Sequence, residues 1–107
     1  MGVTAPPPTS FVQRAQGAAF TIAGGAPGWI DTDISSAVPA GARMIALRCW
    51  ASANQDCGAR APGSSVSTVF NNPGLVFEFI LANCANQHVE LYRDAANNAY
   101  YIQGYWT

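Results

Sequence analysis

The hydrophobic pattern of this chain is that of short β-strands separated by turns. Runs rich in Val, Ile, Phe, Tyr and Trp alternate with clusters such as GGAPG, APGSS and NNPG, and such clusters mark turns. No stretch of eleven or more residues carries apolar positions at helical spacing. The pattern predicts strands near residues 10–14, 18–23, 29–34, 43–51, 57–61, 66–70, 75–82, 88–93 and 99–106.

Seven or more short strands with frequent turn signals favour a two-sheet sandwich or a small barrel. We therefore predict an all-β protein, an antiparallel β-sandwich of jelly-roll-like type. The length of 107 residues fits one domain with a single modest core. We expect this domain to span residues 10–107.

Residues 1–9, MGVTAPPPT, are expected to form an extended N-terminal arm. Pro6, Pro7 and Pro8 favour polyproline II geometry and have no N–H groups for a sheet ladder. A disordered tail and an arm lying on a neighbouring subunit both fit this composition. The sequence leaves these two alternatives open.

Alternation within the strands separates a core face from an outer face. Tyr101 and Tyr105 are expected to point outward together with Gln103, while Ile102 marks the buried face. In residues 75–82, the apolar positions share one side and Glu78 lies opposite them, where it could pair with Arg48 or Arg60. The positions expected to share a core side within each strand are Ile45, Leu47, Cys49 and Ala51; Leu75, Phe77, Phe79 and Leu81; Val89 and Leu91; and Tyr100, Ile102, Gly104 and Trp106.

Outward aromatic side chains are the candidates for contact with partners. Tyr and Trp are enriched at protein interfaces, although single exposed rings packed against flanking loops are common. The proline-rich arm is a second candidate. The predicted partner-contact residues are Pro6, Pro7, Pro8, Trp50, Tyr92, Tyr101 and Tyr105.

Charged residues make up only 10% of the chain, whereas about a quarter is typical of soluble domains. The chain has no Lys, and its five Arg and six acidic residues give a net charge of −1. A nucleic-acid or anionic-membrane binder needs a basic patch, and none is visible. The low charge fits a surface covered by partners and equally a surface rich in Ala, Ser, Asn and Gln.

The three cysteines are an odd number, so at least one lacks a partner within the chain. Cys49 and Cys84 lie in apolar runs, where a free Cys behaves as a small hydrophobe. We expect reduced thiols, with a Cys49–Cys57 or Cys57–Cys84 disulfide as the alternative. The chain start shows no basic and apolar leader pattern, and no run reaches transmembrane length, so synthesis in a cytoplasm is expected.

No catalytic, cofactor or metal site is predicted. His88 is the single histidine, and no G-x-S-x-G motif or phosphate-binding glycine loop is present; both are common marks of catalytic or nucleotide sites. Asp31 and Asp33 share one side of a strand, but a metal ion would need more ligands than the pattern supplies. We expect solvated carboxylates or Arg partners there, and no enzymatic activity.

Three segments resemble small β-sandwich structural proteins of tailed bacteriophages. They are WIDTDISSAVPAGARMIALRC, then CGARAPGSS, then LVFEFILANCANQHVELYRDAANNAYYIQGYW. The resemblance covers residues 27–107 and rests on the cadence of strands and turns. Its matching positions are Trp29, Asp31, Asp33, Gly58, Arg60, Tyr101, Gly104, Tyr105 and Trp106.

This resemblance implies a non-enzymatic virion component made in a host cytoplasm, often a homotrimer, without a cofactor. Foremost among the implied roles is a capsid decoration (cement) protein that binds the major capsid protein and stabilises the assembled head. A carbohydrate- or receptor-binding module of a tail or tail fibre is the alternative. In that alternative Trp50, Tyr92, Tyr101 and Tyr105 would stack on sugars, with hydrogen bonds from Asp31, Asp33 or Asn98.

Overall fold

The computed structural model describes residues 10–107, apart from the side chains of residues 14–18. Within this range the regular elements are all strands, and no helix is long and apolar enough to cross a membrane. The strands are β1 (Phe11–Ile22), β2 (Gly28–Asp33), β3 (Met44–Ala51), β4 (Gln55–Cys57), β5 (Ala59–Arg60), β6 (Phe70–Asn72), β7 (Phe77–Asn83), β8 (His88–Arg93) and β9 (Asn98–Trp106).

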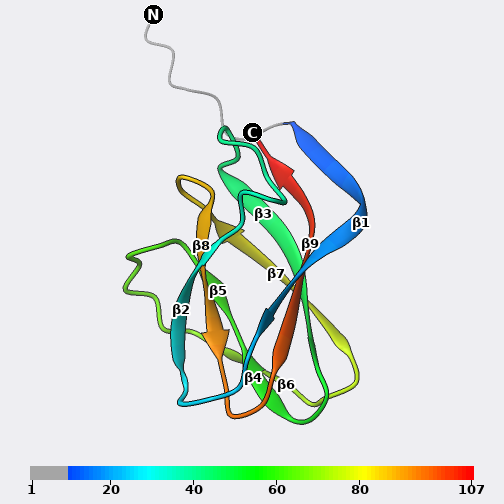
Figure 1. Cartoon of the computed structure of the whole chain (residues 1–107), viewed down its shortest axis with the longest axis vertical. Helices are drawn as coiled ribbons and strands as arrows, with labels where there is room; N and C mark the ends of the chain where they lie inside the picture. The colour runs from blue at the N-terminus through cyan, green and yellow to red at the C-terminus, as the bar shows by residue number, and fades with distance from the viewer. Residues whose placement is uncertain (1–9) are drawn as a thin grey trace, which may run out of the picture.

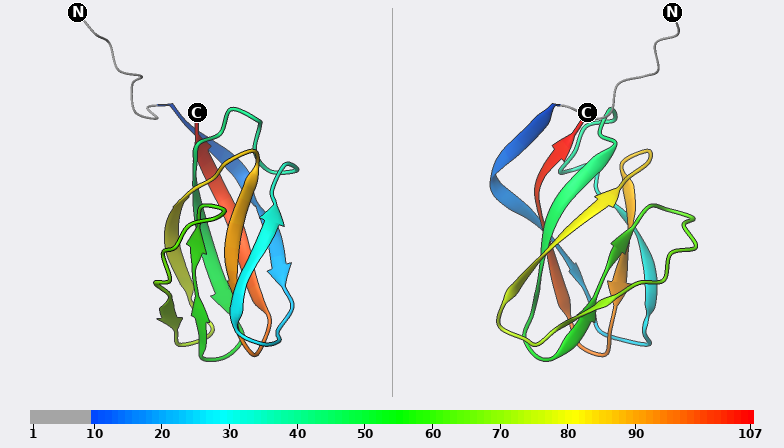
Figure 2. Two further views of the ribbon diagram at one scale, coloured as in Figure 1. Left: turned by 90° about the vertical axis from the view of Figure 1, so that its left-hand side faces the viewer. Right: turned by 180° about the vertical axis from the view of Figure 1, so that it is seen from behind.

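The strands form two antiparallel layers, as Figures 1 and 2 show. Sheet A has the order β1-β9-β3-β7. The second layer contains sheet B, which has the order β2-β8-β5. It also contains β4, which lies on the other side of Gly58 from β5 and pairs with β6. The carbonyl of Gly58 accepts a 2.9 Å hydrogen bond from the Tyr92 N–H, which holds this joint beside β8.

The chain crosses between the two layers at almost every connection, as in a jelly roll. Sheet A takes β1, β3, β7 and β9, and the second layer takes β2, β4, β5, β6 and β8. The predicted all-β, jelly-roll-like sandwich is therefore confirmed. The arm predicted at residues 1–9 lies outside the described residues.

One buried cluster fills the space between the sheets. Alternate residues of β3 and β8 point into it, as their sequence patterns predict, and so do Tyr100 and Ile102 of β9. The loop after β2 closes one end with Ile34, Ala37 and Val38. The predicted core faces of β3 and β8 are thus confirmed.

The predicted face assignment of β9 is wrong beyond Ile102. The pairing of β3 with β9 shifts register between the Leu47–Ile102 pair and the Ala46–Gly104 pair, so one residue is inserted. Such a bulge reverses the side to which the following side chains point. Tyr105 lies opposite Ile45 and packs against the core, whereas Trp106 lies opposite Met44 on the outer face.

The predicted core side of β7 is wrong, because the side that carries Phe77, Phe79 and Leu81 faces outward. Ile80 and Ala82 point into the core, while Phe79 and Leu81 are 76% and 63% exposed. The turn before β7 contains two residues with positive φ, Gly74 at 101° and Leu75 at 62°. On its inner side β7 lies close to β5.

Three strand boundaries also differ from the predicted ones. Residues 10–14 and 18–23 belong to one long strand, β1, whose register with β9 shifts between Gln13 and Ala18. The strand predicted at 57–61 is divided at Gly58. The strand predicted at 66–70 lies later, at Phe70–Asn72, because Gly63 and the polar run after it form an irregular loop.

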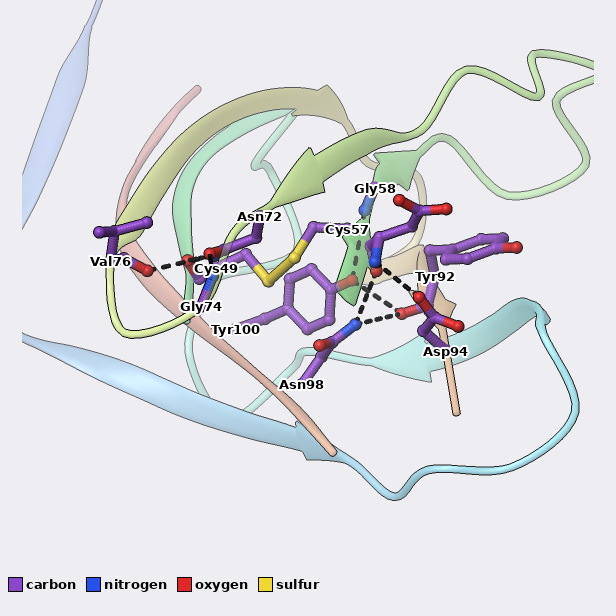
Figure 3. Close-up of a disulfide and its surroundings, with 11 residues drawn as sticks. Cys49, Cys57, Gly58, Asn72, Gly74, Val76, Tyr92, Asp94, Asn98 and Tyr100 are labelled. Atoms are coloured by element: carbon purple, nitrogen blue, oxygen red, sulfur yellow. Dashed lines mark hydrogen bonds between the residues drawn. A yellow bond between two sulfur atoms is a disulfide. The ribbon is translucent and has the colours of Figure 1, made fainter. Parts of the chain in front are cut away.

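Cys49 and Cys57 form a disulfide that joins the two sheets, as Figure 3 shows. Their Cα atoms are 6.6 Å apart, and both residues are fully buried. Cys84 is the remaining cysteine and is a buried free thiol. The expectation of reduced thiols is therefore wrong for Cys49 and Cys57, and the alternative pairing is the one observed.

Candidate interaction surface

The outer face of sheet A carries rows of apolar and aromatic side chains contributed by neighbouring strands. Trp50 of β3 lies opposite Phe77 of β7. One row further, Arg48 lies between Phe79 of β7 and Tyr101 of β9. Residues directly opposite in an antiparallel ladder point to the same side, so these rings form one continuous surface.

The apolar side chains of this surface are strongly exposed to solvent. Leu75 and Phe79 are exposed by 72% and 76%, and Phe77 by 46%. Large contiguous exposed apolar patches mark interaction sites on soluble proteins. We call the strip formed by Leu75, Phe77, Phe79 and Leu81 the β7 stripe.

Arg48 is the charged side chain in the centre of this face. Its guanidinium carbon lies 4.3 Å from the centroid of the Phe77 ring, which is a cation–π geometry. The Phe77 ring also meets the Tyr101 ring edge-on at 5.9 Å. The predicted ion pair of Glu78 with Arg48 or Arg60 is wrong, because Arg48 lies against a ring and Arg60 pairs with Glu90.

At the other end of sheet A, Phe11 covers the end of β9. Its ring lies 4.5 Å from the Trp106 ring. A Cβ atom at Gly104 would collide with the Phe11 ring and with the Val12 carbonyl, so glycine lets β1 and β9 approach each other here. Phe11 itself stays 44% exposed, which extends the apolar surface along the sheet.

The outer face of sheet B is polar and carries charges of both signs. Asp31 and Asp33 of β2 point to the same side, as predicted, and the Asp31 carboxylate lies 2.9 Å from the His88 Nδ1. The hydrogen bonds that Ser35 donates lower the pKa of Asp33. The hydrogen bond from Arg60 likewise lowers the pKa of Glu90.

A cluster around Trp29 organises the centre of this face. The Arg60 guanidinium carbon lies 4.2 Å from the centroid of the Trp29 ring, and the Arg60 Nε donates a 2.5 Å hydrogen bond to Glu90. Tyr92 meets Trp29 edge-on at 5.3 Å. Gly58 lies beneath, where a Cβ would come within 2.8 Å of the Trp29 ring. These contacts hold the side chains in one arrangement.

A buried polar network closes the end of the sandwich near the disulfide (Figure 3). The Tyr100 hydroxyl donates a 2.7 Å hydrogen bond to the Tyr92 carbonyl and accepts one from the Gly58 N–H at 3.3 Å. Burial raises the pKa of Tyr100 to about 12. The Asn98 side chain donates to the Asp56 carbonyl at 2.9 Å. This network joins β4, β8 and β9 and is structural, because its groups are turned inward.

The structure separates the predicted contact residues. Trp50 and Tyr101 share the outer face of sheet A, whereas Tyr92 lies on sheet B and Tyr105 packs against the core. Pro6, Pro7 and Pro8 lie outside the described residues. The sequence analysis did not predict the β7 stripe as a contact surface. The only sequence signal of this stripe is an apolar residue at every second position, twice before Glu78 and twice after it along the chain.

Among residues 10–107, no group of three or more His, Cys, Asp or Glu side chains could hold a metal ion. His88 contacts Asp31 on the surface. No protein family model matches the chain, and no curated protein or solved structure shows significant similarity to it.

Proposed function

We propose that the protein is a non-enzymatic structural protein that acts by binding other protein through the outer face of sheet A. The observation that carries this proposal is the β7 stripe, whose central residue Phe79 is 76% exposed. Burying one such ring from water stabilises an assembly by roughly 2–3 kcal/mol. A surface that gains so much from being covered is suited to assembly.

Within this class we propose a bacteriophage virion protein, foremost a capsid decoration protein. The sequence resemblance over residues 27–107 supports this role, and jelly rolls are a common architecture of viral capsid proteins. A fold alone does not determine function, so the apolar face is the stronger support. Many bound copies would bridge shell subunits and add buried area at each contact between subunits. Because the copies would bind the closed shell and not the opened one, their binding would stabilise the closed shell.

A receptor-binding module of a tail is the second candidate, and the outer face of sheet B favours it. Tyr92 lies one row from the charged side chains Asp31 and Glu90, and a ring beside carboxylates can stack on a sugar while hydrogen-bonding its hydroxyls. Asn98 and Tyr105 do not belong to such a site because they are turned inward. Jelly rolls also serve as lectin domains.

The test uses phage heads assembled without this protein. Purified protein is mixed with these heads, and separately with tails, and co-sedimentation and the temperature of head opening are measured. We expect wild-type protein to sediment with heads and to raise their opening temperature. Phe79→Ser should weaken binding, whereas Val66→Ser, a matched change at a residue that is 54% exposed and outside the stripe, should not.

Two outcomes would overturn the decoration role. Binding to tails alone, together with glycan-array signals lost in Tyr92→Ala, would establish the receptor-binding alternative. Binding to neither heads nor tails would overturn the virion assignment altogether.

A further inference from the structure

The four outer edges of the two layers are protected to very different degrees. The β1 edge has a register shift between Gln13 and Ala18, and the β2 edge carries the exposed carboxylates of Asp31 and Asp33. The β6 edge is three residues long. Irregularity, charge and shortness are the usual means by which proteins prevent edge strands from pairing with other chains.

The β7 edge is neither irregular nor short, and its outward side chains carry no charge. Its seven residues pair with β3 without a register shift, and among residues 10–107 no other strand pairs with it. Its outward side chains include Phe77, Phe79 and Leu81, and its single charged residue, Glu78, points to the inner side. A long, regular, apolar edge is a template for another strand.

The backbone groups available at this edge can be identified from the ladder. The Cys84 N–H donates a 3.0 Å hydrogen bond to the Arg43 carbonyl, just beyond the end of β7. Backbone groups alternate in direction along a strand, so those of Ile80 and Ala82 point toward β3. The N–H and C=O groups of Phe79 and Leu81 therefore point toward the open edge.

The occupant of this edge must supply a strand with free backbone groups and uncharged apolar side chains at every second position. The nine N-terminal residues of the chain do not meet this requirement, because three of them are prolines without an N–H. Among the described strands, β7 itself meets it. A strand that supplies the backbone groups and side chains that its own open edge requires can pair with the same strand of a second copy about a two-fold axis.

We propose that two copies of this chain pair through antiparallel β7 strands, so that sheet A of one copy continues into sheet A of the other. Pairing centred on Ile80 overlaps the whole of β7 and places Phe79 opposite the partner's Leu81. The two β7 stripes then lie side by side on one outer face, and their side chains cover one another. This inference goes beyond the proposed function, because it holds whether or not the protein belongs to a virion.

Light scattering after size-exclusion chromatography tests this pairing on the full chain. We expect wild-type protein to have twice the chain mass and to dissociate on dilution. Leu81→Lys should raise the dissociation constant by at least about tenfold, because each dimer would replace two apolar contacts across the paired edge with two Lys side chains, which oppose edge pairing. Val66→Lys, a matched change at an exposed residue outside β7, should leave the dimer intact.

Amide hydrogen exchange distinguishes edge pairing from other contacts. The amides of Phe79 and Leu81 should exchange slowly in the dimer and quickly in Leu81→Lys. The amides of Ile80 and Ala82 should stay protected in both, since they bond to β3, and this shows that the variant is folded. A monomer at all concentrations, a trimer, or a dimer whose Phe79 and Leu81 amides exchange quickly would overturn the proposal.

Discussion

Tyr105 lies directly opposite Ile45 in the β3–β9 ladder, on the core side of sheet A. Four residues earlier, Tyr101 lies opposite Arg48 on the outer face. The two residues are an even number of positions apart, so their rings would share a face in a regular strand. The bulge after Ile102 separates them, so that one supports the fold and the other is available to a partner.

This separation predicts unequal effects of the same substitution. Tyr105→Ala should lower the free energy of unfolding by about 2–3 kcal/mol, because it leaves a cavity at the core. Tyr101→Ala should cost about 0.5–1.5 kcal/mol, the value of its edge-on contact with Phe77. Urea unfolding of both variants measures the difference. Equal losses would contradict the face assignment derived from the bulge.

The strands whose faces were predicted correctly have unequal faces. In β8 one side is apolar and the other carries charged or polar groups, for example Glu90 beside Val89 and Leu91, and in β3 the outer side carries the charge of Arg48. Alternation then determines the inner side, because the wrong register would bury charge. The bulge in β9 has no comparable signal, since Gly104 is the only unusual residue near it.

The orientation of β7 shows a second limit of sequence reasoning. Both of its sides are apolar apart from Glu78, so burial of Phe79 and burial of Ile80 are both plausible from the sequence. In the fold β7 packs close to β5, and such a contact between segments distant in the sequence leaves no mark on the alternation within β7. For the same reason the β7 stripe could not be predicted as a site, whereas Trp50 and Tyr101 could.

The Cys49–Cys57 disulfide predicts a defined pattern of thiol reactivity. A thiol reagent should find almost no reactive group in native protein, because burial raises the pKa of the Cys84 thiol. One thiol should react after unfolding and all three after unfolding with reductant, since the chain has three cysteines. Two or more fast-reacting thiols in native, unreduced protein would contradict the disulfide.

Removal of this disulfide should also lower stability. The cysteines are eight residues apart, and closing a loop of this size stabilises a fold by about 2.5 kcal/mol in the chain-entropy description. We expect Cys49→Ala/Cys57→Ala to lose about this much in urea unfolding. Added reductant should shift the wild-type curve toward that of the variant and leave the variant unchanged.

Tyr100 predicts a loss of stability at alkaline pH. Burial raises its pKa in the folded state to about 12, above the value of 10.0 that it has when unfolded. Its contribution is complete below pH 10 and is lost as the pH rises toward 12, because only the unfolded state then releases the proton. The two-unit difference corresponds to roughly 2–3 kcal/mol.

The control for this pH effect is Tyr100→Phe. At neutral pH this variant should be about 1–3 kcal/mol less stable than the wild type, since the Tyr92 carbonyl and the Gly58 N–H lose a buried partner. Between pH 10 and 12 the two proteins should approach each other in stability. Parallel curves across this range would show that Tyr100 does not titrate with the raised pKa.

Arg60 predicts a graded response on the outer face of sheet B, because it serves three partners. Arg60→Gln removes the cation–π contact with Trp29 and the hydrogen bonds to Glu90 and to the Val66 carbonyl, and should cost about 1–2 kcal/mol at neutral pH. Glu90→Gln, the matched control, removes the ion pair and weakens the hydrogen bond accepted from the Gly63 N–H, and should cost less than about 1 kcal/mol. Tryptophan fluorescence should change in the first variant and stay nearly constant in the second.

The pH dependence of these two variants follows from the lowered pKa of Glu90. A carboxylate with a lowered pKa contributes stability above its ordinary pKa and loses that contribution as the pH falls through its folded-state value. The stability gap between wild type and Glu90→Gln should therefore close in acid, while part of the gap to Arg60→Gln persists, since Trp29 does not titrate. If the Arg60→Gln gap closed completely, the ion pair alone would stabilise this face.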